Sequence, residues 1–246
     1  MAERATPGKR FLPLCKAEME EYGWDRPDFV YVTGDAYVDH PSFGVAIISR
    51  ILEDAGFRIA IIAQPDYKSC EAFKEYGRPR LGFLVSAGNI DSMVAHYTVA
   101  KKKRTYDYYS PGGVMGKRPD RAIIVYCNRI REAYGDVPII LGGLEASLRR
   151  FAHYDYWDDA VRPSILIDSQ ADLLLYGMGE KVIKQLTEQL QEGKDIHSIR
   201  DIRGTCYLCT QDEIPAESVS CASFRKVSEN KESYAKAHQI QNEWQD

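Results

Sequence analysis

The sequence predicts an α/β protein built on a doubly wound, mostly parallel sheet. Three observations support this prediction: a strand, helix and strand in succession over residues 29–63, further apolar strands separated by helical segments, and an amphipathic helix at Glu180–Gln191. Strands that alternate with helices along a chain favour a parallel sheet with helices packed on both faces.

The first strand–helix–strand unit is the clearest local signal. Phe29–Thr33 (FVYVT) is an apolar, β-rich run that ends at Gly34, as expected for a buried parallel strand. Pro41 suits a first helical position, apolar residues follow at helical spacing, and Gly56 ends the predicted helix. Residues 58–63 (RIAIIA) form the second strand, so the crossover should be right-handed. This unit favours a flavodoxin-like or Rossmann-like sheet.

The remaining elements extend the same pattern. Strands are predicted at residues 81–86, 137–141 and 173–176, with 165–167 as a candidate for a short additional strand. Helices are predicted at residues 69–76, 119–134 and 180–191, and the last of these has four apolar residues on one face, Val182, Ile183, Leu186 and Leu190. Residues 97–117 show no sustained period and predict a long surface loop.

The composition changes toward the end of the chain. We expect an N-terminal extension at residues 1–24, the sheet domain at 25–210, and the start of a linker or of a truncated further domain at 211–246. Residues 229–246 predict a charged helix without a wide apolar face, so the sheet domain should have a polar helical C-terminal extension.

Charge and hydropathy exclude several classes of protein. A net charge of −4 and an isoelectric point near 5.8 give no general attraction for a phosphate backbone, and the densest basic run is only residues 101–104. The first ten residues lack the apolar centre of a signal peptide, and no stretch approaches the roughly 20 apolar residues of a membrane span. We therefore expect a cytoplasmic protein that binds neither nucleic acid nor membrane.

Three loops follow predicted strands and define a candidate ligand rim, because open α/β sheets bind ligands beyond the carboxyl ends of their strands. They contribute Asp35, Asp39, His40 and Gly44, then Gly142, Gly143 and Glu145, then Gly177, Gly179 and Glu180. No residue is assigned a catalytic role. The alternative is that the glycines only turn the chain and the carboxylates only cap helices.

The six cysteines are expected to be thiols rather than disulfides in a reducing compartment. Cys206 and Cys209 have the spacing of half a zinc site, but only Cys221 follows them. A closed zinc site needs four ligands, so the sequence favours structural thiols and predicts no metal site.

Longer strings in the sequence resemble a known family. YVDHPSFG with RIAIIAQPD, then GGLEASLRR, AHYDYWDD and DLLLYGMGEK, resemble the N-terminal region of the uncharacterised YgiQ-type radical S-adenosylmethionine (radical-SAM) proteins, over nearly the whole chain. The double glycine Gly142-Gly143 and the turn from Gly177 to Glu180 match the cobalamin-binding-like domain found at the front of many radical-SAM proteins.

For a full-length relative the resemblance implies cofactors, but the motifs that bind them are absent from this sequence. Radical-SAM proteins hold a [4Fe–4S] cluster and S-adenosylmethionine through C-x₃-C-x₂-C, and the six cysteines here contain no such triplet. Cobalamin proteins with a histidine lower ligand use D-x-H-x-x-G, whereas Asp39 and His40 are adjacent and Gly44 lies four residues after His40. We expect no cofactor on this chain.

Three functions remain open. The first is a substrate-side accessory domain of a radical-SAM protein, whose catalytic barrel follows in cis or belongs to a separate chain, and whose rim of Asp35, Asp39, His40 and Glu145 helps to bind an unknown small molecule. The second is a non-catalytic module that binds a small ligand or a partner, and the third is an atypical cobalamin-binding domain. A reading frame that continues into C-x₃-C-x₂-C would favour the first.

Overall fold

The centre of the molecule is a six-stranded sheet. The computed structural model describes residues 11–244, so the polar segment 1–10 and residues 245–246, the end of the predicted C-terminal helix, lie outside the described residues. The strands are β1 (Phe29–Thr33), β2 (Ile59–Ala63), β3 (Gly82–Ser86), β4 (Ile139–Leu141), β7 (Leu173–Leu175) and β8 (Thr205–Cys206). Their order is β2-β1-β3-β4-β7-β8, and only β8 runs antiparallel to its neighbour.

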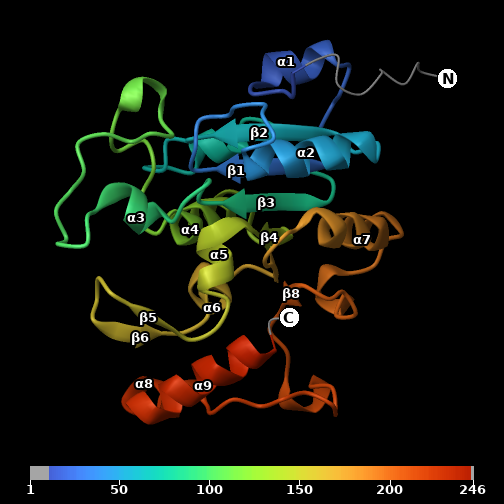
Figure 1. The fold of residues 1–246 in the computed structure, drawn as a ribbon. Helices are drawn as coiled ribbons and strands as arrows, with labels where there is room; N and C mark the ends of the chain where they lie inside the picture. The colour runs from blue at the N-terminus through green and yellow to red at the C-terminus, as the bar shows by residue number, and fades with distance from the viewer. Residues whose placement is uncertain (1–10, 245–246) are drawn as a thin grey trace.

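Helices cover both faces of this sheet, which confirms the predicted doubly wound α/β fold. One face packs against α2 (Gly44–Asp54) and α7 (Glu180–Gln191), and the other against α4 (Ala122–Tyr134) and α6 (Ile165–Ser169). Figure 1 shows α2 and α7 in front of the sheet and α4 behind it. Every residue of β1 is buried, because neighbouring strands and helices surround it on all sides.

The two helices on the front face are amphipathic. In α7 the apolar residues predicted from the sequence are buried against the sheet, and Gly193, with φ of +86°, follows the end of the helix. Helix α2 begins at Gly44 and not at Pro41 as predicted. The reason is local, since Phe43 is extended at the N-cap position and the preceding residues form a turn.

The remaining elements complete the chain. They are α1 (Lys16–Glu21), η1 (Glu71–Lys74), α3 (Ser92–His96), η2 (Pro111–Gly113), α5 (Gly143–Leu148), β5 (His153–Asp155), β6 (Ala160–Arg162), η3 (Ile196–Ser198), η4 (Gln211–Glu213), α8 (Phe224–Glu229) and α9 (Lys231–Glu243). Strands β5 and β6 form a separate antiparallel hairpin. Residues 97–117 are largely without regular structure, as predicted.

Two local predictions were wrong. Residues 165–167 belong to helix α6 rather than to a strand, because the Ser164 hydroxyl accepts a hydrogen bond from the Leu166 N–H and caps a helix at that point. Residues 69–76 contain only the short 3₁₀ helix η1, which places Phe73 in the core.

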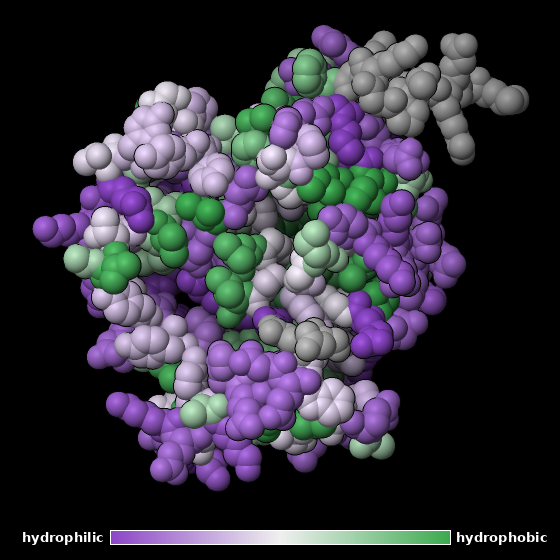
Figure 2. All heavy atoms as spheres, viewed as in Figure 1, coloured by the Kyte–Doolittle hydropathy of each residue, from purple (hydrophilic) through white to green (hydrophobic). Residues whose placement is uncertain are grey.

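The C-terminal helices α8 and α9 pack against one another beside the β5–β6 hairpin. Val227 and Ala237 are buried there, and the Tyr234 hydroxyl accepts a hydrogen bond from the Tyr154 N–H. Figure 2 shows that the exposed surface of these helices is mostly hydrophilic, whereas apolar side chains gather over α5. Among residues 11–244, none of the helices combines the length and the apolar character needed to cross a bilayer.

Candidate functional site

The three glycine-containing loops border one cavity at the carboxyl edge of the sheet. The cavity has a volume of about 200 Å³ and lies over the ends of β1, β3, β4 and β7. Six residues singled out from the sequence line it: Gly44, Gly142, Gly143, Gly177, Gly179 and Glu180. The strand order changes direction between β1 and β3, and ligands of open α/β sheets bind at such a point.

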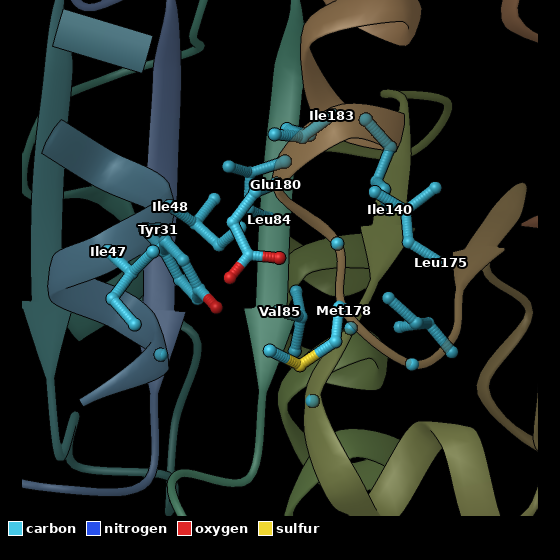
Figure 3. A pocket seen from close by; sticks show the side chains of 16 residues that line it. Tyr31, Ile47, Ile48, Leu84, Val85, Ile140, Leu175, Met178, Glu180 and Ile183 are labelled. Atoms are coloured by element: carbon cyan, nitrogen blue, oxygen red, sulfur yellow. The ribbon is translucent and has the colours of Figure 1, made fainter. Parts of the chain in front are cut away.

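The walls of this edge cavity are apolar, with two polar groups directed into it. Branched side chains from the strands and from α2 and α7 form the floor and sides: Ile47, Ile48, Leu84, Val85, Ile140, Leu175 and Ile183. Figure 3 shows the hydroxyl of Tyr31 and the carboxylate of Glu180 pointing into the space, with the Met178 side chain beside them. An apolar enclosure with few polar groups is typical of a small-molecule site.

The local sequence explains why the loops come so close together. Gly143 has φ of +82°, and a Cβ atom there would lie 3.3 Å from the Cβ of Ser86, so glycine allows α5 to start directly beside β3. The Ser147 hydroxyl donates to the Gly143 carbonyl at 2.8 Å and accepts from the Gly177 N–H at 3.2 Å. Ser147 therefore ties the second loop to the third.

Glu180 is the acidic residue best placed to contact a ligand. It is half-buried in the first turn of α7, and within residues 11–244 its carboxylate has neither a hydrogen-bond nor an ion-pair partner. No side chain caps this helix, so its first N–H groups also face the rim. A carboxylate in this position can bind a hydroxyl, an amine or a cationic group of a ligand.

Asp35 does not line the edge cavity, because it is buried in an ion network. Its carboxylate accepts from the Asn89 N–H at 2.7 Å and from the Arg118 guanidinium at 2.9 Å. Arg118 is itself buried and also donates to Asp107 at 3.0 Å. Burial raises the pKa of Asp35 to about 6, despite the hydrogen bond from Asn89 and the charge of Arg118. The network anchors the loop that follows β1.

Glu145 is also buried below the edge. One carboxylate oxygen accepts from the Ser92 N–H and hydroxyl at 2.8 and 2.6 Å, and the other accepts from the Ile123 N–H at 3.2 Å. Burial, followed by the nearby charge of Asp91, raises the pKa of Glu145. These contacts satisfy N–H groups at the starts of α3 and α4 and give Glu145 a structural position.

Asp39 and His40 lie on the turn before α2 and outside the cavity lining. Asp39 forms an ion pair with Arg50 of α2, and the Arg50 hydrogen bond lowers the pKa of Asp39. The Nδ1 atom of His40 accepts from the Ser42 N–H at 3.1 Å. Two of the four proposed rim residues are therefore on the surface turn, and two are below it.

Among residues 11–244, the side chains do not assemble the ligand sets of the iron–sulfur cluster or the cobalamin that the resemblance suggests. Cys127 is buried in the core and Cys206 is half-buried on β8, whereas Cys209 and Cys221 are exposed. Within residues 11–244, no three His, Cys, Asp or Glu side chains gather in a metal-binding arrangement. Asp39 and His40 are each held by local partners and do not form a ligand relay.

Sequence reasoning missed Tyr31 and Ser147. The sequence predicts a strand at Tyr31, and alternation along FVYVT puts Tyr31 on the face of Phe29, where it reaches the cavity. Burial raises the pKa of its hydroxyl, so Tyr31 stays neutral at neutral pH. Ser147 had no signal of its own, because its partners come from two different loops.

Comparisons with known proteins point to one family. A family model described as "Radical SAM N-terminal" matches residues 11–246. A UPF0313 protein of Clostridium perfringens (strain ATCC 13124) is 61% identical over 238 residues, which is 96% of this chain and 36% of the relative. A UPF0313 protein of Clostridium botulinum (strain ATCC 19397) is 59% identical over 231 residues, 94% of this chain and 36% of the relative.

The chain therefore spans about 36% of the length of these relatives. No experimentally determined structure matches it. The match of the family model over nearly the whole chain, together with relatives at about 60% identity, settles the family. The chain belongs to the radical SAM N-terminal family.

Proposed function

We propose that this chain is the accessory, substrate-side region of a radical-SAM iron–sulfur protein, and that its edge cavity receives an apolar group of the substrate. The observation that carries the proposal is the convergence of all three glycine loops on one apolar cavity with Tyr31 and Glu180 directed into it. Burying an apolar group there gains about 25 cal/mol for each Å² removed from water. Glu180 then orients the substrate through a hydroxyl or amine.

The cluster and S-adenosylmethionine belong, in this proposal, to the part of the relatives that the chain does not span. The exposed residues on α5 and in the loop after β7 would face that part and close the cavity: Leu144, Leu148 and Met178. Exclusion of water from the site suits radical chemistry, because it protects a reactive species from side reactions. The partner is thus the remainder of the polypeptide, or a separate chain that carries it.

Gly142→Val gives a direct test. A Cβ atom at Gly142 would meet nothing within 4 Å and the backbone there is extended, so valine fits locally but fills part of the cavity. The substitution is placed at the aligned position of the full-length Clostridium perfringens relative. Ala160→Val, at an exposed position of strand β6, is the matched control.

The readout is formation of 5′-deoxyadenosine from S-adenosylmethionine, with and without a small-molecule extract of the host cells. We expect the extract to stimulate the wild type and the control, and to stimulate Gly142→Val at least about tenfold less, the effect of losing roughly 1.4 kcal/mol of binding. Iron content and the rate without extract should be equal in all three proteins. Equal stimulation of Gly142→Val and the control would show that the cavity does not bind the substrate.

A further inference from the structure

A second cavity lies beside α5, between α3, the loop at residues 97–104 and the β5–β6 hairpin. Its volume is about 460 Å³, and it shares no lining residue with the edge cavity. Its walls include four aromatic rings and two aliphatic side chains: Tyr97, Tyr154, Tyr156, Trp157, Val94 and Leu148. The rings of Tyr97 and Trp157 lie against one another at an interplanar angle of 38°, with a centroid separation of 4.2 Å. Such walls suit a flat ligand.

The loop and the hairpin are tied across this cavity, so its shape is present without a ligand. The Tyr156 hydroxyl donates to the Val99 carbonyl at 2.6 Å, and the Lys101 ammonium donates to the Trp157 carbonyl at 3.0 Å. Lys101 also lies over the Tyr156 ring, 5.0 Å from its centroid. A preformed site loses less conformational entropy when it binds a ligand.

The charges around the cavity favour an anion. Both carboxylates in its lining already have arginine partners, Asp91 with Arg149 and Asp155 with Arg121. The guanidinium of Arg104, which also lines the cavity, donates through Nε to the Val94 carbonyl at 3.1 Å and makes no other hydrogen bond within residues 11–244. Within the part of the chain that the structure describes, Arg104 has no carboxylate partner, so its terminal N–H groups are available to an anionic group.

His153 supplies a neutral polar group to the same cavity. Its Nδ1 atom lies 3.2 Å from the Phe151 carbonyl, which fixes a proton on Nδ1 and leaves Nε2 as an acceptor. Burial lowers the pKa of His153 below its usual value, so the ring is uncharged at neutral pH. The cavity therefore combines aromatic walls, an unpaired cation and one acceptor.

We propose that this cavity binds a small molecule with a flat aromatic ring and an anionic group, the ring against Trp157 and Tyr156 and the anion on Arg104. Nucleoside monophosphates and aromatic carboxylates share this chemistry. The site is independent of the radical-SAM assignment, because it rests on side chains of this chain alone.

Calorimetric titration of the chain with adenosine 5′-monophosphate, adenosine and indole-3-acetate tests the proposal. We expect one or both anions to bind, and adenosine to bind at least about tenfold more weakly than its monophosphate if the nucleotide is the ligand. In NMR spectra of the same titration, the indole N–H signal of Trp157 should shift, whereas those of Trp24 and Trp244 should not. Binding of the nucleotide alone identifies a nucleotide site, and binding of indole-3-acetate alone identifies an aromatic carboxylate site.

Variants locate the interaction. Arg104→Gln should weaken binding roughly tenfold or more, since a hydrogen bond to a charged group is lost, and Lys102→Gln is the matched control because Lys102 belongs to the same basic run but does not line the cavity. Trp157→Leu should weaken binding roughly tenfold, whereas Trp157→Phe keeps the ring. Absence of anion binding at about 1 mM, binding of adenosine as tightly as its monophosphate, or equal effects of Arg104→Gln and Lys102→Gln on binding of the anion would overturn the proposal.

Discussion

Two glutamates at the carboxyl edge have opposite environments, and their substitutions should separate structure from function. Glu145 is buried and accepts three hydrogen bonds, so Glu145→Ala leaves the Ser92 and Ile123 N–H groups unsatisfied. We expect a loss of about 3 kcal/mol or more in the free energy of unfolding, measured by urea denaturation. Glu180→Ala removes a carboxylate without partners in the described structure and should change it by less than about 0.5 kcal/mol.

The comparison has a clear contradicting outcome. If Glu145→Ala is as stable as Glu180→Ala, Glu145 does not hold the starts of α3 and α4, and its place in the structure as described is wrong. A large loss for Glu180→Ala would show that its carboxylate supports α7 rather than a ligand.

Asp35 should make the protein less stable as the pH rises through weakly acidic values. Its folded pKa of about 6 lies above the ordinary value of 3.8, so between these values the folded state binds more protons than the unfolded state. The contribution of Asp35 to the free energy of unfolding is therefore largest below 3.8 and falls until about pH 6. Asparagine cannot titrate in this range.

The difference in unfolding free energy between the wild type and Asp35→Asn should consequently shrink from about pH 4 to about pH 7. Chemical denaturation at several pH values measures it, and the carboxyl carbon signal of Asp35 should titrate near pH 6. A difference that grows with pH would mean that Arg118 holds Asp35 ionised, with a lowered pKa.

At the scale of residues, the sequence pointed to the loops that border the cavity and to Glu180, but not to the burial of Asp35 and Glu145 below it. Glycines that follow predicted strands mark the loops at the carboxyl edge of the sheet, and Gly44, Gly142 and Gly177 all line the cavity. How deeply a side chain is buried is harder to predict, because burial depends on partners that are distant in the sequence. Arg118, far along the chain, draws Asp35 inward, and Ser92 does the same for Glu145.

At the scale of elements, β8 and the loop after it hold two cysteines whose thiols should differ in reactivity. Burial raises the pKa of Cys206 on β8 to about 11, whereas Cys209, three residues later, is exposed. Because the thiolate is the reactive form, iodoacetamide should modify Cys209 and Cys221 first, Cys206 more slowly and the buried Cys127 last. Mass spectrometry of timed samples measures this order, and modification of Cys206 as fast as Cys209 would place β8 outside the sheet.

Elements with a strong local signal were predictable, whereas those that depend on distant partners or on a single cap were not. Strand β1 and helix α7 have the bounds expected from the sequence, because four apolar residues in a row followed by a β-branched threonine, and a four-residue apolar stripe, are strong local signals. Strands β5, β6 and β8 have only two or three residues each, and their pairing depends on partners distant in the sequence. Helix α6 depends on one serine cap.

For the whole molecule, exposed apolar residues gather at the edge that holds the cavity. Val94, Leu144, Leu148 and Met178 are each about half exposed or more, and Figure 2 shows the apolar surface over α5. The chain covers 36% of the Clostridium perfringens relative, so the other 64% of that protein lies outside the matched part. We propose that this remainder packs on the carboxyl edge, whereas the opposite edge, at residues 135–138, stays free.

Hydrogen exchange tests this arrangement most directly. Protection factors correct each exchange rate for the effect of the neighbouring side chains, so they can be compared between this chain and the full-length Clostridium perfringens relative. The comparison concerns residues 142–148, 177–180 and 135–138. The account predicts greater protection of the first two segments in the full-length protein, by about tenfold or more, and no change in the third. Equal protection at the carboxyl edge, with new protection at residues 135–138, would contradict it.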